Sequence, residues 1–198
     1  EVTEQLMIRT SGLIVIKSTV IPSVVKRLSD KNHRVIYNPE FLTERNALID
    51  FVNPPMHVFG GHENETEQLH KFYTTNSRCK PAPIFKMSAA EAAFVKYGIN
   101  SFLATKVLWF NQYKDMIDDF GSDPRIGQSH TQVPGPDGRA GFGGACFPKD
   151  TSALIGFDHG NILSVLKLVV QENSVYRNQY ELDSREKEQN VVYIESNV

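Results

Sequence analysis

The sequence predicts an α/β fold in which part of a Rossmann-like, doubly wound sheet is followed by a long helix and an all-α central region. Over residues 1–86, short apolar runs rich in β-branched residues alternate with polar helical stretches, as in βα units of a parallel sheet. From Ser88 onward, apolar residues instead recur at helical spacing. This change in period predicts one domain over 1–86, a helical domain over 87–180, and a remainder over 181–198.

The composition excludes several classes of protein. The 198 residues are 40% hydrophobic and carry a net charge of -2, so the chain can bury a substantial core but presents no basic field for nucleic acid or an anionic membrane. The six histidines show no metal-ligand spacing, so no metal site is expected. The two cysteines are too few for a disulfide scaffold, and no apolar run approaches the roughly 20 residues of a spanning helix. These features favour a cytoplasmic protein with free thiols.

Within the first domain, four apolar runs are the expected strands, at 13–17, 34–38, 57–61 and 84–87. Helices are expected from around Pro22 and after Gly61. The chain opens directly in a helical pattern without a capping residue, which is typical of a fragment or of a chain that lacks its start.

One long helix is predicted over 88–120, with Ser88 and Glu91 as a capping box and Gly121 as the stop. Such a length exceeds what a compact domain of this size usually needs, so the helix should link two domains or pack against its copy in a homodimer.

A Gly/Pro-rich loop over 121–150 follows, and loops of this length are usually functional. Two further helices are expected near 151–155 and over 162–180. The charged run 181–190 should be solvated, and 191–198 is either a strand that begins another domain or a frayed tail.

Cys146 is the strongest candidate for chemistry. It lies in GFGGACFPKD, where glycines let the backbone approach a ligand and Pro148 suits the first turn of a following helix. A thiol before a helix N-terminus, with Lys149 close by, has the environment of a nucleophile. The alternative is a small buried hydrophobe in a tight turn, which is the preferred interpretation of Cys79.

Other polar residues stand where ligands bind, although each has a structural alternative. Lys96 and Asn100 are four residues apart on the long helix and either line a pocket or face solvent. Glu40 and the pair Ser18-Thr19 follow predicted strands, at the edge where α/β sheets bind ligands, but each could equally cap a helix. GFGG is neither the dinucleotide fingerprint nor a P-loop, and the sequence contains no GxGxxG.

Four segments, in this order, resemble the UDP-glucose/GDP-mannose dehydrogenase family of nucleotide-sugar oxidoreductases: KSTVIP, NPEFLTERNAL, SAAEAAFVKYGINSFLATKVLWFNQ and GFGGACFPKD. The similarity runs from about residue 1 to residue 180. FGGACFPKD is most similar to the members that oxidise UDP-glucose, and those that oxidise GDP-mannose or UDP-N-acetylmannosamine are the nearest alternatives.

The resemblance implies that two NAD+ take hydride in succession from C6 of UDP-glucose or a related nucleotide sugar. Cys146 would trap the aldehyde as a thiohemiacetal, which is then oxidised to a thioester. Lys96 and Asn100 would stabilise the oxyanion, and Glu40 would act as general base or orient the hydrolytic water. Asp150 and Thr19 would position a water and assist proton transfer.

The same matching assigns the binding residues. NAD would contact Ser18, Thr19, Val20, Glu44 and Lys149, and the sugar nucleotide would contact Glu40, Phe41, Leu42, Lys96, Asn100, Arg125 and Gly143. Arg125 matches an arginine that in the family reaches the substrate of the neighbouring subunit, which fits a homodimer through the long helix. The half of the family's NAD-binding domain that carries GxGxxG is absent from the sequence. The family ends in a second nucleotide-binding domain, but this sequence ceases to match the family after about Tyr180.

Two alternatives from other classes remain at this stage. The chain could be a non-catalytic remnant that only dimerises through the long helix. It could also be a thiol hydrolase or acyltransferase that pairs Cys146 with a histidine such as His130.

Overall fold

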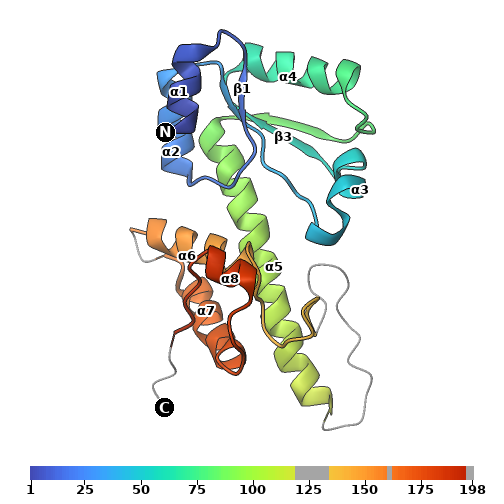
Figure 1. Ribbon diagram of the computed structural model, residues 1–198, viewed down its shortest axis with the longest axis vertical. Helices are drawn as coiled ribbons and strands as arrows, with labels where there is room; N and C mark the ends of the chain where they lie inside the picture. Colours follow the sequence, from blue (N-terminus) through green and yellow to red (C-terminus); the bar gives the residue numbers. More distant parts are fainter. Residues whose placement is uncertain (119–133, 160–161, 195–198) are drawn as a thin grey trace. The chain divides into compact units, whose positions relative to one another are not determined.

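The computed structural model describes residues 1–118, 134–159 and 162–194 (Figure 1). The chain divides into two compact units, Glu1–Lys96 and Tyr97–Val198, and the division falls inside helix α5 (Ala89–Asp118). The units therefore divide after Lys96, whereas the change in period predicts a boundary between residues 86 and 87.

The first unit contains a four-stranded sheet in the order β1-β2-β3-β4. All four predicted strands form, as β1 (Ile14–Ile16), β2 (Val35–Tyr37), β3 (His57–Gly60) and β4 (Ile84–Met87). The pairs β1-β2 and β3-β4 are parallel, as predicted, whereas β2 and β3 are antiparallel. The α/β fold class is confirmed, and the expectation of an entirely parallel sheet is wrong at this one pair.

The segment between β2 and β3 explains the antiparallel pair. A parallel connection needs a crossover that carries the chain to the opposite edge of the sheet. Here the chain forms the short 3-10 helix η1 (Glu44–Asn46) and helix α3 (Ala47–Val52), ahead of Pro54 and Pro55. It therefore enters β3 from the edge at which β2 ends.

Helices cover both faces of this sheet. Alternate residues of β2 point to opposite faces, so that Val35 and Tyr37 join one core cluster and Ile36 joins another. The first cluster receives α2 (Pro22–Lys31) and the first turns of α5, and the second receives α4 (Glu63–Asn76). Helix α1 (Val2–Arg9), at the start of the chain, confirms the helical pattern predicted there.

The close packing of β3 on α5 depends on a glycine. A Cβ at Gly60 would lie 2.5 Å from the Cβ of Ala92, so only glycine lets this strand approach the small residues of the helix. The predicted capping box of α5 is confirmed, because the Ser88 N–H donates to Glu91 Oε2 at 2.8 Å and the Glu91 N–H donates to Ser88 Oγ. The predicted stop at Gly121 lies outside the described residues.

The second unit is helical, as predicted. It contains the remainder of α5, α6 (Phe147–Phe157), α7 (Ser164–Arg177) and α8 (Ser184–Glu188). Ala104, Val107 and Leu108 of α5 pack with Phe142 and Val169 in its core. Helix α6 includes the expected segment 151–155 and begins at Phe147, with Pro148 in its first turn as the sequence suggests.

The charged segment 181–190 is mostly exposed, as its composition predicts, but it also forms a helix with one buried residue. It contains α8, which opens with a capping box between Asp183 and Glu186, and Glu186 is fully buried. The following residues 191–194 form no strand, but Val191 is buried and the Ile194 N–H donates to Ser174 Oγ at 3.1 Å. This segment therefore packs onto α7.

Within residues 1–118, 134–159 and 162–194, no helix combines the length and the apolar character that crossing a membrane requires.

Candidate active site

Cys146 is the N-cap residue of α6, at the end of the glycine loop. Its thiol is exposed, forms no disulfide and makes no capping hydrogen bond. This exposure excludes the alternative of a buried small hydrophobe. The carbonyl of Cys146 accepts a hydrogen bond from the Asp150 N–H at 2.8 Å, so the first turn of α6 fixes the backbone that carries the thiol.

A buried carboxylate lies one turn after Cys146. Asp150 is fully buried, and its Oδ2 accepts from Asn100 Nδ2 at 2.6 Å, while its Oδ1 pairs with the ammonium of Lys149. Asn100 is itself buried, which excludes the alternative of a solvent-facing amide. Separate roles are expected for Asn100, Lys149 and Asp150 from the sequence, whereas the structure joins them through Asp150. Charge and hydrogen bonds thus satisfy the buried carboxylate.

The glycine loop before Cys146 is held by buried side-chain amides. Asn111 accepts from the Gly141 N–H at 2.9 Å, and Asn173 accepts from the Phe142 N–H at 2.7 Å and donates back to the Phe142 carbonyl. Gly141 has a φ of +75°, a conformation that favours glycine. These two N–H groups therefore serve the fold of the loop, although the sequence suggested that the loop would offer bare N–H groups to a ligand.

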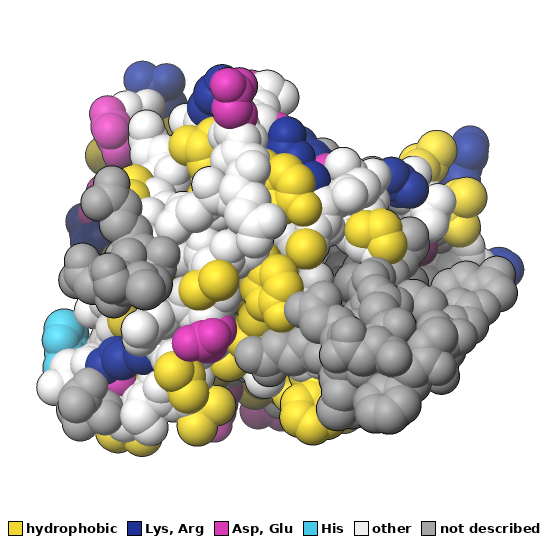
Figure 2. Space-filling view, turned by 90° about the horizontal axis from the view of Figure 1, so that it is seen from below, with side chains coloured by type: hydrophobic (Ala, Val, Ile, Leu, Met, Phe, Trp, Pro, Cys, Tyr) yellow, Lys and Arg dark blue, Asp and Glu magenta, His cyan; other side chains and the backbone are white. Residues whose placement is uncertain are grey.

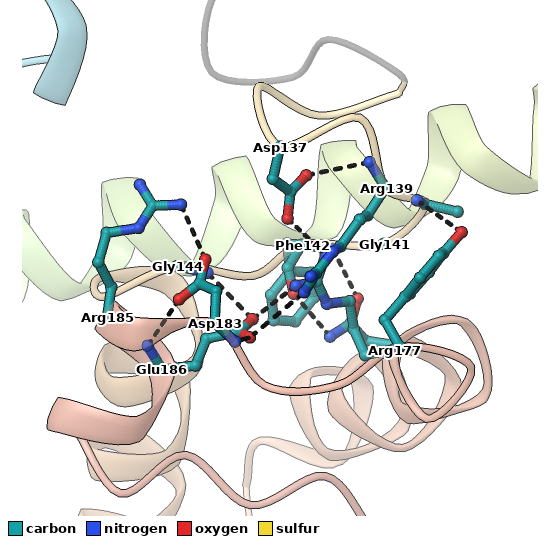
Figure 3. Close-up of polar contacts among 12 residues, drawn as sticks. Asp137, Arg139, Gly141, Phe142, Gly144, Arg177, Asp183, Arg185 and Glu186 are labelled. Atoms are coloured by element: carbon teal, nitrogen blue, oxygen red, sulfur yellow. Dashed lines mark hydrogen bonds and ion pairs between the residues drawn. The ribbon is translucent and has the colours of Figure 1, made fainter.

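Arg177 and Glu186 form a buried ion pair beside this loop (Figure 3). Arg177 is 1% exposed, donates to Glu186 Oε1 at 2.6 Å and pairs with Asp137 Oδ2 at 2.9 Å. A Cβ at Gly143 would collide with both the guanidinium and the Glu186 carboxylate. Gly143, which the resemblance assigns to substrate, is thus required by the close approach of Arg177.

The surroundings shift the ionisation of this pair. Burial alone would lower the pKa of Arg177, but its contacts with Asp137, Tyr193 and Glu186 raise it. Burial alone would raise the pKa of Glu186, but hydrogen bonds from Asp183 and Tyr193 and the charge of Arg177 lower it below its ordinary value. Both groups are therefore ionised at neutral pH.

In the first unit, Glu40 is held through its backbone and its side chain. Lys96 Nζ donates to the Glu40 carbonyl at 2.7 Å and lies 5.5 Å from the ring centroid of Phe41. The Glu40 carboxylate pairs with the ammonium of Lys17. Glu40, Phe41 and Leu42 line one pocket together with Lys17, so this unit brings together three of the predicted substrate residues.

Lys17 has no role in the sequence-based assignment, and it lies at the centre of a polar cluster. Its Nζ donates to Asn38 Oδ1 at 2.8 Å and to the Tyr73 hydroxyl at 2.9 Å. Burial lowers the pKa of Lys17 to about 8, against the opposing effect of Cys79. The sequence does carry a signal for this cluster, because polar residues directly follow two buried strands: Lys17 follows β1 and Asn38 follows β2.

The predicted NAD residues are placed in part. Ser18 is exposed, Thr19 is half-buried, and Val20 packs against the core, all in the loop after β1. This loop and the one after β2 lie at the carboxyl ends of two paired parallel strands, the edge at which α/β sheets bind ligands. The hydroxyls present there fit a contribution to an NAD site, although the sequence supplies no glycine fingerprint.

Some predicted residues cannot be placed. Arg125 and His130 lie outside the described residues, as does the side chain of Glu44, the first residue of η1. Thr19 belongs to the first unit and Asp150 to the second. Among the described residues, no group of His, Cys, Asp and Glu side chains could hold a metal ion.

The exposure of Cys146 predicts selective modification. In the folded chain, iodoacetamide should alkylate Cys146 roughly tenfold faster than Cys79, which is half-buried and donates its thiol to the Phe51 carbonyl at 3.1 Å. Peptide mass spectrometry over time measures both rates, and the urea-unfolded chain is the control in which the two rates converge. Faster alkylation of Cys79 in the folded chain would contradict this geometry.

Comparisons with known proteins agree with the resemblance in the sequence. Residues 2–76 match the NAD binding domain of the UDP-glucose/GDP-mannose dehydrogenase family, and residues 90–174 match its central domain. A UDP-glucose 6-dehydrogenase of Rickettsia bellii is 36% identical over 85% of this chain and 42% of its own length. The TuaD UDP-glucose 6-dehydrogenase of Bacillus subtilis is 31% identical over 83% of this chain and 39% of its own length.

Solved structures show the same similarity. A UDP-glucose dehydrogenase from Pyrobaculum islandicum has a TM-score of 0.63 and 32% identity, over 82% of this chain and 41% of that one. A UDP-D-ManNAc dehydrogenase from Pyrococcus horikoshii, at 17% identity and a TM-score of 0.68 over 89% of this chain and 46% of that one, shows a shared fold. The chain spans about two-fifths of the curated relatives it matches. The matched models also confirm NAD as the cofactor expected for the family.

The two family models, matched in chain order, correspond to the α/β sheet unit and to the helical unit that carries Cys146. The chain therefore belongs to the UDP-glucose/GDP-mannose dehydrogenase family.

Proposed function

We propose that this chain supplies the catalytic core of an NAD-dependent oxidation of UDP-glucose to UDP-glucuronate. The observation that carries the proposal is the exposed, free thiol of Cys146 at the N-terminus of α6, one turn before the buried Asp150. Relatives named UDP-glucose 6-dehydrogenase, at 31–36% identity, give the substrate class. The two free cysteines fit the reducing environment of the cytoplasm.

The proposed reaction proceeds through a covalent bond to Cys146. When bound, NAD+ accepts the hydride in each of the two oxidations. The first removes hydride from C6 and a proton from its hydroxyl, giving an aldehyde, to which the Cys146 sulfur adds as a thiohemiacetal. Loss of the second hydride and a proton leaves a thioester. Water then adds to the thioester carbon, the C–S bond breaks, and the carboxylate and the free thiol are formed.

The chain's own residues have distinct proposed roles in these steps. Lys96 and Asn100 stabilise the negative oxygen of the adducts, a task suited to one cation and one amide on a rigid helix. Glu40 accepts a proton from the hydrolytic water or orients it. Thr19 and Asp150 position a water and assist proton transfer. Within the first unit, the contact of Lys96 with the Glu40 carbonyl supports its role, and within the second unit the contact of Asn100 with Asp150 does the same.

Binding roles complete the proposal. Ser18, Thr19, Val20, Glu44 and Lys149 contact NAD, and the loop after β1 lies at the edge of the sheet that suits this. Phe41, Leu42, Arg125 and Gly143 join Glu40, Lys96 and Asn100 around the nucleotide sugar. The pocket that Glu40, Phe41 and Leu42 line in the first unit supports part of this assignment.

The test is NADH formation by the purified protein. UDP-glucose should give two NADH for each UDP-glucuronate, with a higher kcat/KM than GDP-mannose or UDP-N-acetylmannosamine. Preference for another nucleotide sugar would correct the substrate and leave the thioester route intact. Absence of NADH with every sugar, together with self-association, would instead favour a dimerising remnant without catalysis.

We propose further that a second copy of this chain packs against α5. Phe94, Phe102 and Trp109 lie on this helix with exposed fractions of 49%, 63% and 62%. Gly98, between the two phenylalanines, is exposed, and a Cβ there would meet nothing within 4 Å, so a second backbone has room to approach. Figure 2 shows hydrophobic side chains reaching the surface at several places on the face it presents.

Replacing Phe102 with glutamate should therefore weaken the dimer. Loss of one buried phenylalanine costs about 1.5–3 kcal/mol, which raises the dissociation constant roughly tenfold or more. Sedimentation equilibrium measures this change. The matched control is Phe72→Glu, on α4, where the side chain is 56% exposed. Equal dissociation constants for the wild type and Phe102→Glu would place the partner elsewhere.

A further inference from the structure

The ammonium of Lys17 is fixed where β1 and β2 end. These strands are parallel neighbours with Ile16 opposite Tyr37, so the residues that follow them lie together. Lys17 Nζ contacts Asn38 Oδ1 at 2.8 Å, the Tyr73 hydroxyl at 2.9 Å and the Glu40 carboxylate. An ammonium has three protons, and three acceptors surround this one.

The acceptors that hold Lys17 are themselves constrained. Asn38 is 2% exposed, and its Nδ2 donates to the Val58 carbonyl of β3 at 3.0 Å. Its Oδ1 therefore faces both Lys17 and the Tyr73 hydroxyl, which donates to it at 2.8 Å. Because the amide of Asn38 is fixed by the sheet, the ammonium has little freedom to turn away from the carboxylate of Glu40.

We infer that Lys17 is a positioning residue for Glu40, holding its carboxylate in one orientation and in the ionised form. This inference rests on the proposed role of Glu40 toward the hydrolytic water. Lys96 holds the Glu40 carbonyl and Lys17 holds its carboxylate, so two lysines from different elements fix the backbone and side chain of one residue. A proton acceptor must be ionised to work and must be aimed at its water.

The charge of Lys17 changes near pH 8. Burial brings the pKa of Lys17 to about 8. Among its neighbours, burial raises the pKa of Tyr73 to about 12, and burial together with Lys17 and His70 lowers the pKa of His57. Tyr73 and His57 thus stay neutral near pH 8. Cys79 is the other group whose charge acts on Lys17, and Glu40 is its ion-pair partner.

The direct test is a carboxyl NMR titration of Glu40 in the full chain. In Lys17→Met, the pH at which Glu40 is half-protonated should rise by about one unit or more, because the neighbouring cation is lost. In Lys17→Arg it should stay near the wild-type value. The matched control is Lys26→Met, since Lys26 forms an exposed ion pair with Asp30 at 2.6 Å on α2. An unchanged Glu40 titration in Lys17→Met would overturn the inference.

Kinetics in the full polypeptide separate this inference from the proposed function. Lys17→Met should lower kcat roughly 10- to 100-fold with little change in KM, and should move the acid limb of the kcat profile to higher pH. In Lys17→Arg, the acid limb of the kcat profile should stay at its wild-type pH, and any change in kcat near pH 8 should disappear. If the Glu40 titration shifts in Lys17→Met but no sugar gives NADH, the dehydrogenase proposal is refuted and the coupling between Lys17 and Glu40 is supported. NADH formation with an unshifted acid limb in Lys17→Met would refute the coupling alone.

Discussion

Replacing Cys146 with alanine should abolish formation of UDP-glucuronate, with a fall in kcat of roughly 10³-fold or more. The proposed thioester requires a sulfur nucleophile, and the exposed thiol at the N-terminus of α6 is the group placed to supply it. Cys146→Ser should be nearly as impaired, because a serine hydroxyl is far less readily ionised than a thiol. Steady-state NADH formation and product analysis measure the loss.

The stoichiometry of the residual reaction distinguishes this role from a structural one. Without the thiol, any remaining turnover should stop at the aldehyde and yield one NADH for each sugar. Cys79→Ala is the matched control, because Cys79 lies in the first unit and its half-buried thiol contacts the Phe51 carbonyl. Its kcat should stay within about twofold of the wild type. Two NADH for each sugar from Cys146→Ala would refute the thioester route.

The elements most accurately predicted from the sequence are those set by local signals. The apolar runs of the first unit formed strands, and Ser88 with Glu91 began α5 where the capping box indicated. Cys146 proved to be the N-cap residue that its glycines and Pro148 suggested. Each of these depends on a period or on a motif of a few neighbouring residues.

What the sequence did not reveal depends on contacts between distant residues. The antiparallel direction of β3 follows from the path of the connection after β2, which no periodicity encodes. Lys17 was assigned no role because its partners Asn38 and Tyr73 come from other elements. Glu186 belongs to a charged run that is typical of a solvated surface, and its burial is apparent only once Arg177 lies against it.

Removing one partner of the buried Arg177-Glu186 pair should strongly destabilise the second unit. Arg177→Met leaves the fully buried carboxylate of Glu186 with the more distant guanidinium of Arg139, at 3.9 Å, in place of its close partner, which costs about 3–5 kcal/mol. Replacing both, as Arg177→Met with Glu186→Leu, should cost less than either single change, because no uncompensated charge stays buried. Urea unfolding measures these free energies, and the single tryptophan, Trp109, reports on this unit.

The pair should also make stability depend on acidity. Because the folded pKa of Glu186 is lowered, its contribution is fully present above its ordinary pKa and is lost as the pH falls through the folded value. The difference in unfolding free energy between wild type and Glu186→Gln should therefore be largest at neutral pH and shrink in acid.

Glu188→Gln is the matched control for the Glu186 variants, because Glu188 lies on the same helix and is exposed. It should change the unfolding free energy by less than about 0.5 kcal/mol at every pH.

The glycine loop links this stability to the proposed chemistry, since Gly144 N–H donates to Glu186 Oε1 at 3.3 Å two residues before Cys146. Arg177→Met should thus also alter the alkylation rate of Cys146 under folding conditions. Equal stability of Arg177→Met and wild type would mean that the Tyr193 hydroxyl and Arg139 hold Glu186 in place without the Arg177 guanidinium.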